Sequence, residues 1–293
     1  MVSGVQRYLC RSCNRSFRSH RRPSTLRSAL WENFVCNRFT VNQLALKHGR
    51  SINWVRTQLR AYEMPSVTLQ PCPIVVVMDC VFFGRTSGYI VVRDPHRRRN
   101  VYWAEIAHET INEYQFARDT LEGMGFTLLA VVTDGKPGLK PLFADIPVQM
   151  CQFHQIAIIT RYLTRNPKLD ASRELRDVMR TLCVADERSF STALTAWHQK
   201  WDQFLKERTT DPLSGHWHYT HKRLRAAYRS LKTNLSYLFS YQRHPDLDIP
   251  NTTNSLDGSF AHLKQLVQIH RGLKTDLKRK IIHYILQNGH RKK

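Results

Sequence analysis

Acidic residues are scarce in this chain of 293 residues, and long apolar runs are absent from it. Aspartate and glutamate number 23 against 45 lysines and arginines, which gives a formal net charge of +22 at pH 7. No stretch has the uninterrupted apolar length that a membrane span needs, and the first ten residues lack the apolar segment of a signal peptide. We therefore expect neither a membrane protein nor a secreted protein, and we predict a cytoplasmic location.

The excess of positive charge is spread along the whole chain and is not confined to a terminal arm. A folded protein that tolerates this self-repulsion usually binds a polyanion. With 42% hydrophobic and 10% aromatic residues, the chain has enough apolar side chains for a sizeable core. Nucleic acid is the partner we expect first. A membrane surface is a weaker second, and a solvated basic face without a partner stays open.

Seven cysteines, an odd number at irregular spacing, indicate reduced thiols and not a disulfide framework. Cys10 and Cys13 form a CxxC motif, the spacing with which a tight turn presents two thiolates to one zinc ion. A zinc ribbon needs two more ligands, and His20 and Cys36 are the local candidates. Residues 1–20 are therefore interpreted as a partial zinc-ribbon knuckle, with Zn²⁺ binding left open.

Residues 21–63 have a helical pattern throughout. Thr40 and Ser51 stand where the N-caps of two successive short helices are expected, and Gly49 lies at the turn between these helices. Two helices joined by such a turn are typical of a helix-turn-helix module.

The second of these helices carries Arg56 and Arg60 on its polar side. In a protein of this charge, that arrangement favours DNA binding over a plain helical hairpin. Residues 64–73 contain prolines and no charged residue, and they predict a linker between this module and the rest of the chain.

Beyond the linker, residues 74–166 have the pattern of strands and helices in alternation. Three antiparallel strands, a helix, a fourth strand, a short helix and a fifth strand that runs into another helix are expected in that order. This is the order of the ribonuclease H fold, an α/β fold in which the first and fourth strands are neighbours. Residues 167–245 lack strand signals and predict an all-helical insertion, and residues 246–293 are expected to complete the core and to end in a basic tail.

Two aspartates close buried strands of this predicted core. Asp79 ends the first strand and Asp134 ends the fourth, so the fold would place the two side by side at the edge of the sheet. Adjacent carboxylates repel unless a divalent cation binds, and two Mg²⁺ ions can activate a nucleophile and stabilise a leaving oxygen in phosphodiester chemistry. Asp257, near the start of a predicted helix after the insertion, is placed to supply a third carboxylate. A turn or capping role for each acid is the plainer alternative.

Four segments of the chain resemble the Mutator-like DDE transposases of bacterial insertion sequences. They read VVVMDC, VVTDGKPGL, MCQFH and PNTTNSLDGSFAHLKQLVQIHRGL, and the resemblance covers most of residues 74–275. It implies a DNA transposase that binds the terminal inverted repeats of an insertion sequence and uses two Mg²⁺ or Mn²⁺ ions for strand cleavage and transfer to target DNA. It also implies a homodimer or a larger synaptic complex, associated with the bacterial nucleoid.

The resemblance also assigns roles to residues of the core. It gives metal binding to Asp79, Asp134 and a third acid, which is a glutamate in the family. Here the third motif position is Asp257, in the sequence Asn-Ser-Leu-Asp. A Cys-x-x-His motif that supports the active site in the family matches Cys151 and His154.

Helical insertions in this family contact DNA near the cut ends, at times through a tryptophan stacked on a displaced base. The candidates for DNA contact are Trp197, with Trp201 and Trp217 as alternatives, and Lys264, His270 and Arg271 of the last motif. Packing in a helical core is the alternative for each tryptophan, and a solvated basic face is the alternative for the last motif.

Two other functions stay open. The aspartate at the third acidic position and the partial zinc knuckle favour a catalytically inactive, truncated or repurposed transposase that acts only as a sequence-specific DNA-binding protein. A stand-alone nuclease of the same fold would cut DNA without joining ends.

Overall fold

Two compact units make up the chain. The computed structural model describes residues 8–17, 25–270 and 272–288. The first unit comprises Met1–Val67 and His262–Ile285, and the second comprises Thr68–Ala261 and Leu286–Lys293. The break after Val67 falls inside the linker that the sequence predicts. Most of the C-terminal segment, which the prediction gave wholly to the α/β core, belongs instead to the unit that contains the N-terminal helices.

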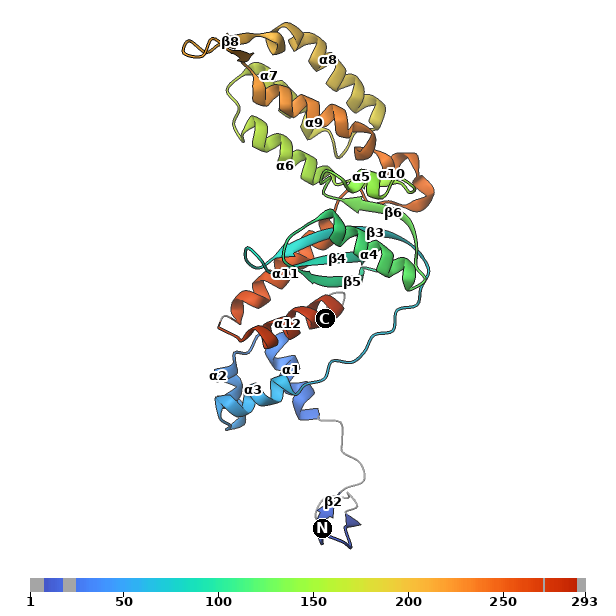
Figure 1. Ribbon diagram of the computed structural model, residues 1–293, viewed down its shortest axis with the longest axis vertical. Helices are drawn as coiled ribbons and strands as arrows, with labels where there is room; N and C mark the ends of the chain where they lie inside the picture. The colour runs from blue at the N-terminus through green and yellow to red at the C-terminus, as the bar shows by residue number, and fades with distance from the viewer. Residues whose placement is uncertain (1–7, 18–24, 271, 289–293) are drawn as a thin grey trace. The chain divides into compact units, whose positions relative to one another are not determined.

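The first unit has a short hairpin followed by three helices (Figure 1). The hairpin pairs β1 (Tyr8–Leu9) with β2 (Ser16–Phe17), and the helices are α1 (Thr25–Val35), α2 (Val41–His48) and α3 (Ile52–Arg60).

The caps of α2 and α3 confirm the predicted boundaries. The Thr40 hydroxyl accepts the backbone N–H of Gln43, and the Gln43 side chain accepts the N–H of Thr40 in return, which satisfies two free donors at the start of α2. Gly49 ends that helix in the left-handed region at φ 57°, and the Ser51 hydroxyl caps α3 by accepting the N–H of Trp54.

The C-terminal segment completes the core of this first unit. The Trp31 ring of α1 stacks on Tyr62, with 4.9 Å between ring centroids, and meets the edge of Tyr284 from α12 (Thr275–Asn288) at 5.6 Å. Trp31 has no exposed surface. Because buried aromatic pairs contribute beyond their apolar area, α12 contributes directly to the stability of the N-terminal helices.

A five-stranded mixed sheet forms the centre of the second unit (Figure 1). Its order is β5-β4-β3-β6-β7. The central strand β4 of the first three pairs antiparallel with both β5 and β3, and the pairs β3–β6 and β6–β7 are parallel. The strands are β3 (Pro73–Phe82), β4 (Gly88–Asp94), β5 (Arg99–Ile106), β6 (Thr127–Thr133) and β7 (Val148–Met150). The predicted α/β class, the antiparallel start and the adjacency of the first and fourth core strands are confirmed.

The helix α4 (Ile111–Gly123) packs on one face of this sheet. Val76 and Met78 of β3 share a buried cluster with Tyr114 and Leu121 of α4. Since side chains alternate along a strand, the residues of β3 that alternate with Val76 and Met78 point to the opposite face of the sheet.

The insertion is mostly helical but contains a hairpin that the sequence prediction missed. Its elements are α7 (Asp170–Arg180), α8 (Glu187–Lys206), β8 (Arg208–Thr210), β9 (Trp217–Tyr219), α9 (Lys222–Leu238) and α10 (Ser240–Arg243). The helix α6 (Gln152–Leu163) precedes the insertion, and the single turn Pro245–Leu247 lies at its end. The prediction of an all-helical insertion is wrong at β8 and β9. Asp211 closes their turn by accepting the backbone N–H groups of Leu213 and Ser214, and Gly215 takes φ 69°.

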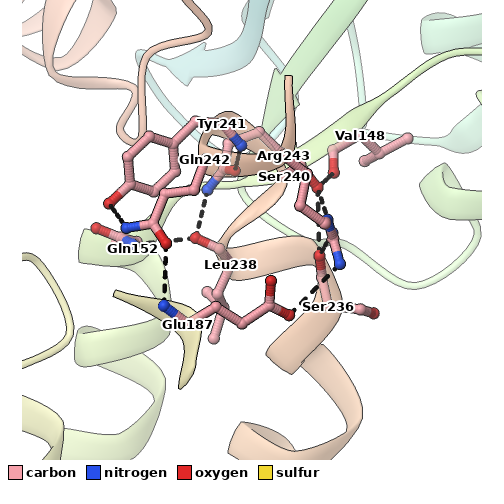
Figure 2. A network of polar contacts seen from close by, with 10 residues as sticks. Val148, Gln152, Glu187, Ser236, Leu238, Ser240, Tyr241, Gln242 and Arg243 are labelled. Atoms are coloured by element: carbon pink, nitrogen blue, oxygen red, sulfur yellow. Dashed lines mark hydrogen bonds and ion pairs between the residues drawn. The ribbon is translucent and has the colours of Figure 1, made fainter. Parts of the chain in front are cut away.

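Buried amides join the insertion to the sheet. Gln149 of β7 has no exposed surface; its amide donates to the carbonyl of Leu238 at 2.9 Å and accepts the N–H of Tyr241 at 3.0 Å. Figure 2 shows the neighbouring contacts, in which Ser240 donates to the carbonyl of Val148 at 2.6 Å. The bonds of Gln149 and Val148 tie α9 and α10 to β7, the strand that leads to the acidic edge of the sheet.

Candidate active site

Three polar residues stand in one row where the parallel strands end. The last paired residues of β3 and β6 are Val77 and Val132, so two residues further on Asp79 lies beside Asp134. The last pair of β6 and β7 is Thr133 with Met150, so the next residue, Cys151, lies beside Asp134 on the other side. The backbone N–H of Cys151 donates to the carbonyl of Thr133 at 2.8 Å and fixes this register.

The row faces away from α4. Val76 pairs with Val131, and both belong to the cluster under that helix, so the acids that alternate with these residues point to the other face. Asp79 and Asp134 are both half-buried there. The two carboxylates therefore share a face and a row, as the sequence analysis predicts for the strand ends.

A threonine connects this row to the third acid. Thr253, which has no exposed surface, precedes α11 (Asn254–Ile269) and directs both its backbone N–H and its hydroxyl at the Cys151 sulfur, each at 3.3 Å. The same hydroxyl lies 3.0 Å from Oδ2 of Asp257 and 3.4 Å from Nδ1 of His154. Since a hydroxyl has one proton, Thr253 donates to either the Cys151 sulfur or Asp257 at a time, and a protonated Nδ1 of His154 donates to the hydroxyl oxygen. Thr253 therefore links Cys151, His154 and Asp257 in one hydrogen-bond network.

Charge is balanced in this cluster by a cationic histidine. Hydrogen bonding to Cys151, followed by the negative charges of Cys151, Asp79 and Asp134, raises the pKa of His154 to about 9 against the opposing effect of burial. Burial alone would raise the pKa of the Cys151 thiol, but hydrogen bonds from His154 and Thr253 outweigh burial and lower it. The pair is therefore polarised toward thiolate and imidazolium, and the imidazolium supplies positive charge to the acidic row.

The same environment keeps a substantial fraction of Asp79 protonated near neutral pH. Burial raises the pKa of its carboxyl to about 7, with smaller contributions in the same direction from the charges of Asp257 and Asp134. The N–H of Cys80 and the positive charge of His154 act in the opposite direction but do not prevail. A cluster in which one acid must take up a proton is one whose repulsion a bound divalent cation would relieve.

Replacement of Asp79 by asparagine is expected to stabilise the metal-free protein at high pH. The ordinary pKa of 3.8 rises to about 7 in the folded state, so the folded state holds the proton between these values and stability falls as pH rises through that window. Urea unfolding in EDTA should therefore show Asp79→Asn more stable than the parent by about 2 to 4 kcal/mol at pH 8, with little difference near pH 4. An equal advantage at both pH values, or the same gain for the exposed Asp119→Asn, would contradict this origin.

The donor set suits a hard divalent cation in its chemistry but is not gathered to coordination distance. Asp79, Asp134 and Asp257 offer carboxylate oxygens, the ligands that Mg²⁺ prefers. Among the residues that the structure describes, no group of three histidine, cysteine, aspartate or glutamate side chains lies close enough to hold a metal ion. The exposed Asp257, in the first turn of α11, would have to move toward the strand ends to complete a site.

A second charged group borders the acidic row and was not predicted from the sequence. The backbone N–H of Lys136 donates to Asp134 at 2.9 Å, and its ammonium group binds the backbone carbonyl of Glu109 at 2.9 Å and the carboxylate of Glu109 at 3.4 Å. The Tyr114 hydroxyl donates to that carboxylate at 3.0 Å. Thr253 was also missed, although a threonine four positions before a helical acid is a recognisable local signal.

The structure places the proposed zinc ligands on a small hairpin. Cys10 and Cys13 lie in the turn between β1 and β2, where the N–H of Asn14 donates to the carbonyl of Cys10 at 2.8 Å. His20 lies outside the described residues, and the Cys36 thiol lies 3.9 Å from the hydroxyl of Tyr284. In the described ranges the structure adds no third ligand to the two cysteines, so zinc binding stays a prediction.

The predicted DNA contacts in the first unit divide by exposure. Arg56 of α3 and Lys264 of α11 are exposed, as a phosphate contact requires. Arg60 is partly neutralised, since its guanidinium binds Asp276 at 2.9 Å. His270 is only 7% exposed and packs against the ring of Phe34 at 4.1 Å, so a role in the core replaces the predicted phosphate contact. Arg271 lies outside the described residues.

The tryptophans of the insertion also differ in exposure. Trp197 is 4% exposed and its indole N–H donates to the carbonyl of Ala171 at 2.9 Å, so it is a core residue here and not the base-stacking surface that was predicted. The indole N–H of Trp201 donates to Glu174. Trp217 of β9 is 51% exposed and is the most exposed of the three.

The comparisons with known proteins give no match that bears on this site. No protein-family model matches the chain, and no curated protein matches it in sequence. Along the described ranges, none of the helices combines the length and the apolar character that crossing a bilayer requires.

Proposed function

We propose that this protein is a metal-dependent DNA transposase with a ribonuclease H-like core. The observation that carries the proposal is the row of Asp79 and Asp134 on neighbouring parallel strands, with Asp257 linked to the same row through Thr253. The net charge of +22 and the helix-turn-helix arrangement of α2 and α3 support a DNA partner.

The carboxylates of Asp79, Asp134 and Asp257 would hold the divalent ions, which supply Lewis-acid activation of the attacking and leaving oxygens. The protein's own groups then have separate tasks. His154 would offset negative charge at the strand ends, and Thr253 would orient the carboxylate of Asp257 by donating a hydrogen bond to it. The basic first unit would bind the ends of the element, as a helix-turn-helix module does.

A DNA-binding protein without catalytic activity is the second candidate. It is favoured by one observation: the described His, Cys, Asp and Glu side chains form no group of three at metal-binding distance. The shorter aspartate at position 257, where the resembled family has glutamate, points the same way, since it reaches less far toward the other two acids.

An assay on a labelled DNA duplex that carries the end of the parent element separates these functions. With Mg²⁺ we expect end-specific binding, strand cleavage and products joined to target DNA, and with EDTA we expect binding alone. Binding under both conditions with no product in either supports the DNA-binding candidate. Cleavage without joined products supports a nuclease, and the absence of end-specific binding contradicts the proposal altogether.

A further inference from the structure

A surface cavity lies in the insertion, on elements other than those that carry the acidic row. Its volume is about 270 Å³. It is lined from α8 by His198 and Leu205 and from α9 by Arg225, Tyr228, Arg229 and Lys232. Drug-sized ligands occupy pockets of roughly 300 to 1,000 Å³, so this cavity suits a smaller group.

The cavity concentrates positive charge on one face of α9. Arg225, Arg229 and Lys232 are spaced so that successive turns of α9 bring them to one face, where like charges repel. None of the three takes part in an ion pair within the described part of the chain. The sequence of α9 contains five basic residues and no acidic one, and its basic first turn also opposes the helix dipole. This arrangement costs stability unless an anion binds.

The walls of the cavity hold part of this charge in a fixed position. The guanidinium of Arg225 lies 3.6 Å from the ring centroid of Tyr219 and donates to the carbonyl of Leu205 at 2.6 Å. On the other side, the rings of Tyr228 and His198 stack with 4.2 Å between centroids and 15° between planes. A side chain that is already ordered loses less conformational entropy when a ligand binds.

From this geometry we propose that the cavity binds a phosphate group in the backbone of a DNA strand, through Arg225, Arg229 and Lys232. The planar guanidinium of arginine can donate two parallel hydrogen bonds to phosphate oxygens, and lysine adds a mobile point charge. The inference rests on the proposed function for the identity of the strand, and it adds a contact on the insertion that is separate from the acidic row.

Nucleic acid fits the surroundings of the cavity better than an anionic membrane does. The half-exposed Trp217 stands on the same strand as Tyr219, the ring that holds Arg225. The guanidinium of Arg208 lies 3.9 Å from the ring centroid of Trp217 and 5.8 Å from that of Tyr219. Alternating cations and aromatic rings are typical of surfaces that bind nucleic-acid strands. A concave site of this size also admits a phosphate more readily than a flat array of lipid headgroups.

The test compares the full-length double variant Arg229→Gln/Lys232→Gln with the parent. Both residues are exposed, so the parent's thermal unfolding should be retained. Binding of a fluorescein-labelled random-sequence duplex, and of its single strand, is measured by anisotropy in EDTA over a range of KCl concentrations. For at least one of these probes, the slope of log K against log salt should become shallower by about 1 to 2, since each lost phosphate contact removes about 0.7 to 0.9.

The control is Arg173→Gln/Arg180→Gln on α7, which removes the same charge from side chains paired with Asp170 and Asp177. It should change the slope by less than half as much. The charge-preserving Arg229→Lys/Lys232→Arg variant should keep most of the parent's slope. Equal slopes for the parent and the glutamine variant overturn the site. Binding to phosphatidylglycerol vesicles is measured alongside, and a variant that loses vesicle binding but keeps the parent's DNA binding also overturns the site.

Failure of the site and failure of the proposed function remain distinguishable in these experiments. EDTA prevents metal-dependent cleavage, so the difference in salt slope between the parent and the glutamine variant reports the contacts of Arg229 and Lys232 independently of catalysis. A parent chain that shows the slope difference but never cuts DNA in Mg²⁺ keeps the site and loses the transposase function. A parent that cuts and joins DNA with unchanged slopes in the variant keeps the function and loses the site.

Discussion

Asp134→Asn is expected to abolish DNA cleavage and joining while DNA binding persists. Asparagine keeps the shape of the side chain and its acceptor for the N–H of Lys136, so the strand end should stay folded. It removes one of two neighbouring carboxylate charges in the row, and a divalent cation that supplies several kcal/mol of transition-state stabilisation would be lost or displaced. Single-turnover cleavage in Mg²⁺ should fall about 1,000-fold or more.

The matched control for this variant is Asp119→Asn on α4. Asp119 is exposed and bonded to Gln115, so it undergoes the same chemical change away from the row. Its cleavage rate should stay within a factor of about two of the parent's, as for surface changes generally. An Asp134→Asn protein whose cleavage rate stays within tenfold of the parent's would contradict the metal-site assignment.

In the same cleavage assay Asp257→Glu should retain or gain activity, because the glutamate carboxylate reaches further toward the other two acids.

Gln149→Leu is expected to cause the largest loss of stability. Leucine fills a similar volume but removes the acceptor for the N–H of Tyr241 and one of the donors to the carbonyl of Leu238. These groups are enclosed where the insertion meets the sheet, and a buried polar group left without a partner costs about 1 to 3 kcal/mol. We therefore expect a loss of about 2 to 4 kcal/mol in urea unfolding.

The exposed Gln199 on α8 provides the comparison for this prediction. Gln199→Leu introduces the same side chain where no buried partner is lost, and its stability should stay within about 0.5 kcal/mol of the parent's. If the two leucine variants were equally stable, the buried amides would not be what ties the insertion to β7. Cleavage measured alongside should weaken for Gln149→Leu only in proportion to the folded fraction.

Local signals in the sequence predicted the elements best where caps and periodicity agreed. Thr40, Gly49 and Ser51 fixed the boundaries of α2 and α3, since each acts on its own neighbours in the chain. The run of β-branched residues in β3 predicted a central buried strand, and the order of elements predicted its neighbour. The hairpin of β8 and β9 was missed because its strands have only three residues each and lie between long helices.

The candidate site was predictable to the extent that strand order determines it. Asp79 and Asp134 follow from the parallel pairing of β3 and β6, which a pattern of buried strands can predict. The contacts of Thr253 could not be predicted, because its partner Cys151 lies 102 residues away and the hydrogen bond depends on how α11 docks. The burial of Trp197 and His270 was equally inaccessible, since packing partners from other helices decide which ring of a helix is enclosed.

The first unit takes residues from two segments that are far apart in the sequence, and this has a consequence for the order in which the protein is made. Trp31 and Tyr62 leave the ribosome long before Tyr284, which packs against both rings. The second unit, Thr68–Ala261, is nearly complete before the first unit can close. Domains generally fold as they are synthesised, from the N-terminus onward. Here the first unit can close only after most of the second has been made, so a nascent chain that stalls before Tyr284 would lack a finished first unit.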